Sequence, residues 1–569
     1  MKHLFACLKK YKKEAILAPL FKLLEATLEL LVPLVVGAII NVGIAGSDKS
    51  YIVWGCAILA GLGFVGLAFA LTAQYFAARA AVGVSAQLRE NLFVKLQSLS
   101  YAEIDGMGTS TMITRMTSDV QQVQTGVNMT LRIFLRSPFI VFGAAGMAFV
   151  VDWRAALVLV AVIPLLAIAV FAVMAATTPL YKKVQERLDG VYTSTRENLS
   201  GARVLRAFCK EEDEIEIFKN KSVALRSAQK KAGRISALTG PLTYVLVNVA
   251  LIVLLFVAAG RIELGALEQG DAVSLYNYLA MILVELIKLA NLIVTLTKAV
   301  SSQRRIGQVL DKESEPAVTL SEGEEKNGDY AVEFENVTFA YEGHAPALKD
   351  IDFKVRRGET VGVLGGTGSG KTTLVNLIPR FYETKEGRVL VGGRDVRSIP
   401  KEELRSRVGV AAQKSVLFQG SIRSNLLWGK GDATDEELNF AVGCAQAEDV
   451  VSSKGGLDGE IAQEGKNLSG GQKQRLSIAR ALVKKPEILI LDDTSSALDY
   501  ATDAKLRRAI SLLGGTTFIV SQRVSSVMHA DKIVVLDDGA IAGIGTHEEL
   551  LSSCEVYREI HDTQFRERA

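Results

Sequence analysis

Six stretches of mainly apolar residues fill the first part of the chain, and more hydrophilic segments separate them. A helix needs about 20 mostly apolar residues to cross the hydrocarbon of a bilayer, and several of the stretches reach that length. The alternative, buried helices of a large soluble core, is disfavoured because all six stretches cluster in one half of the sequence. The pattern therefore predicts six transmembrane helices, at residues 16–43, 51–76, 133–151, 155–180, 242–260 and 272–297.

The segments that join these stretches are unequal in length. Those after the second and fourth stretches, residues 77–132 and 181–241, are long, rich in Lys and Arg, and helical in composition. The positive-inside tendency places them in the cytoplasm together with the Lys-rich N-terminus, so both chain termini are expected there. The long segments predict helices that project beyond the bilayer and turn near residues 98–107 and 208–217.

A change of composition near residue 311 marks a boundary between domains. Residues 311–330 are acidic and poor in large apolar side chains, which is typical of a linker. Beyond them, short β-like runs such as TVGVLG and EILILD alternate with helical segments, and this alternation predicts an α/β domain with a mainly parallel sheet. The expected organisation is a membrane α-helical domain over 1–310, a linker over 311–330 and an α/β domain over 331–569.

The overall composition agrees with a membrane part and a hydrophilic part in one chain. Of the 569 residues, 49% are hydrophobic and 22% are charged. The net charge of +3 gives no indication of a nucleic-acid partner. The five cysteines lack C-x-x-C spacing, which indicates reduced thiols and neither a zinc site nor a disulfide framework. The N-terminus lacks the layout of a cleavable signal peptide, and we expect a multi-pass protein of a bacterial plasma membrane.

The stretch GGTGSGKT, from Gly365 to Thr372, matches the G-x-x-x-x-G-K-[ST] pattern of a phosphate-binding loop. A strand pattern precedes it and a helical pattern follows, so backbone N–H groups and a helix N-terminus are expected to surround phosphate oxygens. Lys371 is expected to reach the β- and γ-phosphates of ATP, and Thr372 to bind Mg²⁺. The expected nucleotide contacts in this segment are Gly365, Gly366, Thr367, Gly368, Ser369, Gly370, Lys371, Thr372 and Thr373.

A second pair of motifs carries a family resemblance. The apolar run ILILD ends at Asp492, an acid suited to orienting the same Mg²⁺. Shortly before it stands NLSGGQKQRLSIARAL, residues 467–482, in which LSGGQ leads into a basic helix. Together these motifs resemble the signature of the ATP-binding-cassette (ABC) transporters. With six spans followed by one cassette, the resemblance covers nearly the whole chain and is to an exporter half-transporter, with an α/β P-loop nucleotide-binding domain after the membrane domain.

The resemblance implies roles for further residues. Tyr341 matches the aromatic residue that stacks on adenine, and Gln413 matches the glutamine that senses the γ-phosphate and Mg²⁺. Asp499 matches the aspartate of the D-loop. Short helices at the two cytoplasmic turns are implied to couple the membrane domain to the cassettes. Cassettes of this family pair head to tail, so these signature residues are implied to complete the ATP site of a second subunit: Ser469, Gly470, Gly471 and Gln472.

Two positions depart from the family pattern at the place of catalysis. Asp493 stands where a glutamate normally polarises the attacking water, and Gln522 stands where a histidine contacts the γ-phosphate. Aspartate is one methylene shorter than glutamate, and a misplacement of about an ångström lowers rates about 100-fold. Glutamine forms hydrogen bonds but carries no proton charge as histidine does. The chain therefore resembles the degenerate-site subunit of a heterodimeric bacterial multidrug-type exporter, which binds ATP and hydrolyses it poorly, while hydrolysis occurs mainly at a composite site formed with the partner.

The function implied by the resemblance is ATP-driven export of hydrophobic or amphipathic compounds across the membrane by alternating access. The expected partners are a second half-transporter subunit, the lipid bilayer and a small hydrophobic or amphipathic substrate. Two alternatives remain at this stage. One is a nucleotide-gated regulator or sensor that transports nothing, and the other is a lipid flippase, which differs only in its cargo.

Charged residues inside the predicted spans also have two interpretations. Glu25 and Glu29 lie four apart in the first span, and Glu285 and Lys288 lie three apart in the sixth, so each pair shares a helix face. Such residues either line a wet cavity for a cationic or amphipathic substrate or join helices through polar contacts. The sequence does not decide between them, and it names no substrate.

Overall fold

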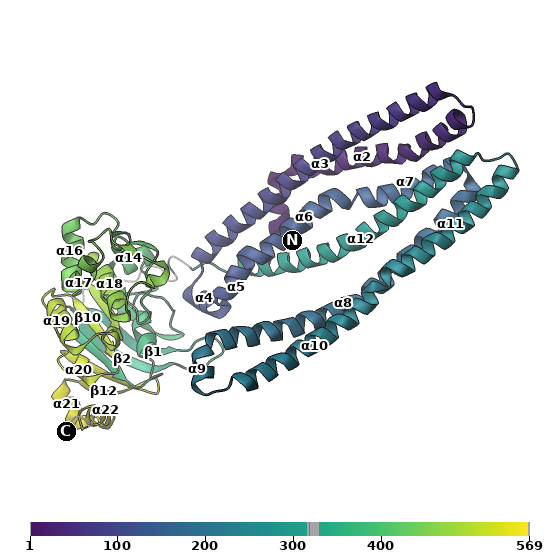
Figure 1. The fold of residues 1–569 in the computed structure, drawn as a ribbon. Coiled ribbons are helices and arrows are strands. Elements are labelled where there is room, and N and C mark those ends of the chain that lie inside the picture. Colours follow the sequence, from purple (N-terminus) through teal and green to yellow (C-terminus); the bar gives the residue numbers. More distant parts are fainter. Residues whose placement is uncertain (1, 316–317, 319–328, 567–569) are drawn as a thin grey trace. The chain divides into compact units, whose positions relative to one another are not determined.

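The computed structural model describes residues 2–315, 318 and 329–566 (Figure 1). These residues form two compact units. The first comprises the described residues within 1–97 and 110–312, and the second comprises those within 98–109 and 313–569. Most of the predicted linker, 311–330, lies outside the described residues.

Helices joined by turns make up the first unit, and none of its described residues lies in a strand. Six helical runs are long and apolar enough to cross a membrane, as the hydropathy pattern predicts: Lys12–Ile44, Lys49–Gln97, Thr109–Val151, Trp153–Ser200, Glu211–Glu263 and Gln269–Leu310. Several contain a kink or break that divides them into separate elements. The helices are α1 (Lys2–Lys10), α2 (Lys12–Ala38), α3 (Lys49–Gln97), α5 (Thr109–Thr114), α6 (Val120–Ile133), α7 (Arg136–Val151), α8 (Trp153–Ser200), α9 (Ala202–Ala207), α10 (Glu211–Ala237), α11 (Thr239–Glu263) and α12 (Gln269–Leu310), with π-helical turns η1 (Ile39–Ile44) and η2 (Arg115–Asp119).

Long helical hairpins dominate this unit, as α2 with α3 and α8 with α10 show in Figure 1. Its core is made of fully buried apolar side chains such as Leu159, Leu254 and Ile282, which come from three different helices. The tight joint between α7 and α8 is held by Asp152. Its carboxylate accepts hydrogen bonds from the N–H of Ala155 at 2.8 Å and from the guanidinium of Arg261 at 2.6 Å, so one acid caps α8 and ties it to α11.

The turn that follows the fourth membrane-type helix lies earlier than the sequence predicts. The chain reverses at Gly201–Lys210, through α9, rather than at 208–217. The acidic residues within the predicted turn instead form the first turn of α10, with Glu211, Glu212, Asp213 and Glu214 at its N-terminus. Acids at that end interact favourably with the helix dipole, so a run of charge here starts a helix.

The second unit contains two main sheets. The four-stranded antiparallel sheet has the order β2-β1-β4-β5, and the six-stranded sheet has the order β12-β11-β3-β10-β9-β6. In the larger sheet β6, β9, β10, β3 and β11 are parallel, as predicted, and only β12 is antiparallel. The strands are β1 (Tyr330–Phe339), β2 (Leu348–Arg356), β3 (Thr360–Gly365), β4 (Glu386–Val391), β5 (Arg394–Asp395), β6 (Val408–Ala411), β7 (Gly420–Ser421), β8 (Glu460–Ile461), β9 (Ile488–Asp492), β10 (Thr516–Ser521), β11 (Lys532–Asp537) and β12 (Ala540–Gly545).

Helices pack around these sheets. Strands β9 and β10 are buried along their whole length, as expected of central parallel strands that are covered on both faces. In a parallel sheet of this kind, ligands bind beyond the carboxyl ends of the strands. The helices are α4 (Tyr101–Met107), α13 (Lys371–Leu377), α14 (Lys401–Arg407), α15 (Ile422–Leu426), α16 (Asp435–Cys444), α17 (Glu448–Ser453), α18 (Gly470–Val483), α19 (Tyr500–Ser511), α20 (Val524–Val527), α21 (His547–Ser553) and α22 (Glu555–Arg566), with short 3₁₀ turns η3 (Gln463–Gly465) and η4 (Thr494–Ala497).

Candidate nucleotide site

The phosphate-binding loop turns sharply between β3 and α13. Gly368 and Gly370 adopt φ values of +84° and +97°, which side chains other than glycine rarely tolerate. A Cβ atom on Gly370 would lie 2.7 Å from the carbonyl oxygen of Ala347. Gly368 and Gly370 are therefore required by the backbone path, which leaves the loop N–H groups at the start of α13.

Lys371 lies folded against this loop. Its Nζ donates hydrogen bonds to the carbonyl oxygens of Gly365 at 2.9 Å and Gly366 at 2.5 Å. Burial lowers the pKa of Lys371, and the negative charges of Asp493 and Asp492 act in the opposite direction. A cation held here by backbone oxygens is suited to anionic phosphate groups, whose oxygens are stronger partners than carbonyls.

Two residues expected to bind Mg²⁺ meet at the end of β9. The Thr372 hydroxyl donates a hydrogen bond to Asp492 Oδ1 at 3.0 Å. Burial raises the pKa of Asp492, and the nearby charge of Asp493 raises it further, so this carboxylate would gain from a cation beside it. The oxygen pair fits Mg²⁺, which binds a few protein oxygens together with phosphates; when bound, the metal neutralises charge on the β- and γ-phosphates.

Asp493 and Gln522, the two positions that depart from the family pattern, lie close to Lys371, Thr372 and Asp492 around one pocket. Asp493 Oδ2 accepts a hydrogen bond from Gln413 Nε2 at 3.3 Å. The Gln522 side-chain oxygen accepts a hydrogen bond from the Thr367 hydroxyl at 3.5 Å. These contacts border a pocket of about 350 Å³, with Ala347 and Val520 as apolar lining. The predicted site residues on this pocket are Tyr341, Thr367, Gly368, Gly370, Lys371, Thr372, Thr373, Gln413, Asp492, Asp493 and Gln522.

The other predicted residues do not line the pocket. Gly365, Gly366 and Ser369 contact the ammonium group of Lys371 from within the loop. Ser469 and Gln472 form a capping box at the start of α18, in which the Ser469 hydroxyl accepts from the Gln472 N–H at 3.3 Å. Asp499 caps α19 by accepting from the Thr502 N–H at 3.0 Å. Ser469 and the next residue of the signature, Gly470, are exposed.

One residue at the site was missed by the sequence analysis. Gln564 of α22 holds the backbone around Gln522. Its Nε2 donates to the Gln522 carbonyl oxygen at 2.7 Å, and its Oε1 accepts from the Val524 N–H at 2.9 Å. Gln564 is one of several polar residues in α22 and no local pattern marks it, so only the tertiary structure reveals the contact.

Helix α4 lies on the cassette within the second unit. The Tyr101 ring stacks on Phe381, with centroids 4.4 Å apart, and the Arg405 guanidinium lies over both rings. The Tyr382 hydroxyl donates a hydrogen bond to Asp105 Oδ2 at 2.5 Å. A short helix at this turn was predicted, and these contacts show which part of the cassette it meets.

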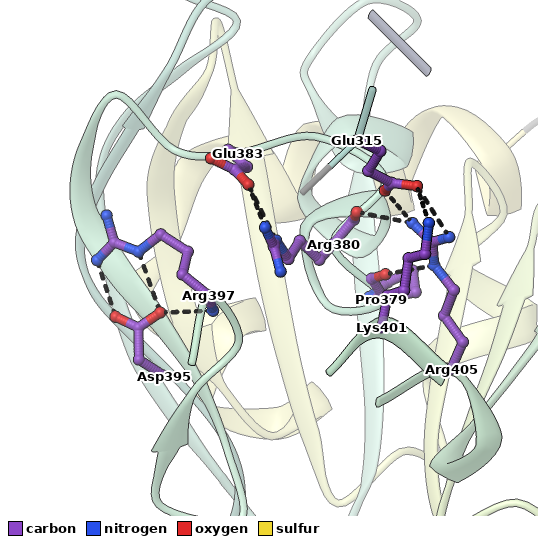
Figure 2. Close-up of polar contacts among 8 residues, drawn as sticks. All are labelled: Glu315, Pro379, Arg380, Glu383, Asp395, Arg397, Lys401 and Arg405. Carbon is purple, nitrogen blue, oxygen red and sulfur yellow. Dashed lines mark hydrogen bonds and ion pairs between the residues drawn. The ribbon is translucent and has the colours of Figure 1, made fainter. Parts of the chain in front are cut away.

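Residue Glu315 reaches the same part of the cassette (Figure 2). Its carboxylate accepts hydrogen bonds from Arg405 at 2.6 Å and from Lys401 at 3.4 Å. The Glu315 N–H donates to the carbonyl oxygen of Ser98, just before α4, at 2.7 Å. Arg405 also donates to the carbonyl oxygen of Arg380, so one guanidinium joins Glu315, the Phe381 turn and the α4 contact.

Six candidate membrane helices followed by a P-loop cassette define the class of protein, and comparison with known proteins agrees. The sequence matches the ABC transporter transmembrane region over residues 15–286 and the ABC transporter domain over 348–496. It is 36% identical to the uncharacterized ABC transporter ATP-binding protein YfiB of Bacillus subtilis, covering 99% of each chain. It is 29% identical to the ATP-dependent lipid A-core flippase of Escherichia coli, covering 99% of this chain and 97% of that protein.

The fold is also similar to a solved structure, that of a bacterial Atm1-family ABC exporter with ATP bound. The TM-score is 0.80 at 24% identity, over 98% of this chain and 99% of that one. The chain belongs to the ABC transporters, and it is a half-transporter of the exporter type with a multi-pass membrane part and an ATP-binding cassette.

Proposed function

We propose that this chain is one half of an ATP-driven exporter in a bacterial plasma membrane, with its termini and its cassette in the cytoplasm. Its cargo is hydrophobic or amphipathic, and it crosses the membrane by alternating access. The observation that carries the proposal is the pocket that contains Lys371, Thr372 and Asp492 in a chain with six candidate membrane helices. The lipid A-core flippases among its relatives, from Escherichia coli and Syntrophus aciditrophicus, support a lipid as one form of cargo.

In this proposal the pocket residues hold the nucleotide and do little chemistry on it. Tyr341 stacks on adenine, Lys371 contacts the β- and γ-phosphates, and the metal is held by Thr372, Gln413 and Asp492. Asp493 is too short to bring its carboxylate to an attacking water, and Gln522 supplies no positive charge at the γ-phosphate. A long-lived ATP complex at this site is the expected consequence.

The signature residues act on the other subunit. Ser469 and Gly470 are exposed at the N-terminus of α18, where backbone N–H groups and the helix dipole favour an anion. We infer that this end of α18, together with Asp499, completes a competent site on a partner that carries the glutamate and histidine that this chain lacks. The partner is therefore a second, different half-transporter.

Transport itself is tested in sealed inside-out vesicles that contain the complex. We expect ATP-dependent uptake of a fluorescent amphipath or a labelled lipid, at a rate at least 10-fold above that of a complex whose chains both lack the P-loop lysine (Lys371→Ala in this chain), because a missing phosphate contact weakens ATP binding. Nucleotide-dependent conformational change without flux would favour the regulator instead.

The heterodimer is tested by tagging this chain in its native cell and identifying what co-purifies in mild detergent. An equal amount of a second half-transporter with a glutamate and a histidine at the two catalytic positions is the expected result. A complex that contains this chain alone would place Asp493 and Gln522 in both sites and would contradict the asymmetric mechanism.

A further inference from the structure

Tyr382 contacts both α4 and Tyr341, a residue that lines the nucleotide pocket. Its ring lies edge-on to Tyr341, with centroids 5.3 Å apart and the planes at 83°. It also packs against Phe339 at 5.7 Å. Tyr341 borders the pocket, and its hydroxyl is 3.1 Å from the Thr373 hydroxyl at the start of α13. One side of Tyr382 therefore rests on the ring expected to receive adenine.

The other end of Tyr382 holds α4. The hydroxyl donates to Asp105 Oδ2 at 2.5 Å. Burial raises the pKa of Tyr382, and the hydrogen bond to Asp105 raises it further, so the hydroxyl stays protonated and remains a donor at neutral pH. No residue of α4 is buried, so side chains that stay partly exposed, such as Tyr101 and Asp105, hold this helix on the cassette.

The turn that carries Tyr382 is fixed. Arg380 is buried and adopts a φ of +53°, an uncommon conformation for a residue with a side chain. Its guanidinium donates to Glu383 at 2.6 Å, and its carbonyl oxygen accepts from Arg405 at 3.1 Å (Figure 2). Because the backbone is held on both sides of Tyr382, the loop does not shift when the ring is displaced. The displacement therefore moves the hydroxyl relative to Asp105.

We propose that Tyr382 is a positioning residue that transmits occupancy of the adenine pocket to α4. The inference rests on the proposed role of Tyr341. A base stacked on Tyr341 restricts that ring, the restricted ring fixes Tyr382 edge-on, and the Tyr382 hydroxyl then holds Asp105. In the sequence, α4 joins α3 to α5, so a change in how firmly α4 is held acts on the connection between these two helices. This transmission needs a bound nucleotide and no hydrolysis, so a site with Asp493 and Gln522 performs it well.

The test is hydrogen–deuterium exchange of the whole complex in lipid nanodiscs, with and without a non-hydrolysable ATP analogue. In the wild-type complex the analogue should slow exchange in residues 98–108. Tyr382→Phe keeps both rings and removes only the hydroxyl, which loses a hydrogen bond to a charged group; the slowing at 98–108 should then fall about 10-fold. The affinity of the analogue for this chain's site should change by less than about 3-fold, because the ring contact with Tyr341 is kept.

Two further variants distinguish transmission of nucleotide occupancy to α4 from a contact that only stabilises α4. Tyr557→Phe removes another buried tyrosine hydroxyl, which lies 2.6 Å from His547 Nδ1, and should leave the response at 98–108 unchanged. Asp105→Asn keeps an acceptor oxygen for Tyr382 and should retain part of the response.

The proposal is overturned if Tyr382→Phe keeps the full nucleotide response. It is also overturned if this variant speeds exchange at 98–108 equally with and without the analogue, because that pattern marks a structural contact only. If the analogue protects the cassette but not 98–108 in the wild-type complex, the inference fails while the proposed nucleotide site stands. If the analogue does not bind at all, both fail.

Discussion

Replacing Asp493 by glutamate and Gln522 by histidine together should raise ATP hydrolysis at this chain's own site by about 10- to 100-fold. Asp493 already faces the pocket, since its carboxylate accepts a hydrogen bond from Gln413 at 3.3 Å, and one more methylene would extend the carboxylate toward the proposed γ-phosphate position. Gln522 already contacts Thr367 of the phosphate loop, so a histidine there is well placed for the same phosphate. The remaining nucleotide contacts are unchanged in the double variant.

The measurement is the ATPase rate of the purified complex whose partner site has been silenced at its own P-loop lysine. Each single variant should give less than the pair, because the acid that orients water and the group that contacts the phosphate act in one transition state. Adding Lys371→Ala to the double variant should abolish the gain. An unchanged rate in the double variant would mean that something other than these two side chains limits hydrolysis.

The sequence predicted those parts of the structure that depend on neighbouring residues in the chain. The six spans follow from continuous apolar runs, and the phosphate loop follows from glycines that the backbone requires at Gly368 and Gly370. The second long turn, predicted at 208–217, was misplaced because the acids at 211–214 stabilise the N-terminus of α10 instead of forming part of the turn. An acidic run is compatible with a turn and with the N-terminus of a helix, so composition alone does not place the turn.

Contacts between distant segments were not predictable. Tyr382 meets Asp105 across 277 positions, and Gln564 meets the Gln522 backbone across 42 positions. No periodicity or spacing relates such pairs. The charged residues of the spans are a similar case, since their pairing depends on how α2, α7 and α12 pack, and the sequence left their role open between a wet cavity and a contact between helices.

In the structure these charges join helices. Arg136 at the start of α7 donates to Glu29 of α2 and to Glu285 of α12, each at 2.6 Å. Glu285 also accepts from Ser137 at 2.6 Å and from Lys288 at 2.7 Å, and its side chain is 3% exposed. Glu25 pairs instead with Lys22 on its own helix. These contacts favour the structural interpretation over a preformed cavity for a cationic substrate.

Replacing Arg136 by methionine should therefore destabilise the membrane unit strongly. Methionine keeps much of the apolar volume, but it leaves the Glu285 carboxylate buried without its guanidinium and removes the link between α2 and α12. Breaking a buried ion pair from one side costs about 3–5 kcal/mol in soluble proteins. The carboxylate then keeps only Ser137 and the partly exposed Lys288 as partners, and a neighbouring bilayer gives it no better solvent. The midpoint of thermal unfolding in detergent should fall by several degrees.

Lys288→Met is the matched control, because it removes a cation from the same carboxylate at a similar distance. The Lys288 side chain is 41% exposed, so its loss should cost about 1 kcal/mol or less. Combining Arg136→Met with Glu285→Gln removes the buried carboxylate charge that has lost its guanidinium partner and should recover much of the lost stability, whereas two independent sites would show additive losses. Equal unfolding midpoints for Arg136→Met and Lys288→Met would mean that the buried ion pair does not hold α2, α7 and α12 together. That result would favour the wet-cavity interpretation of these charges.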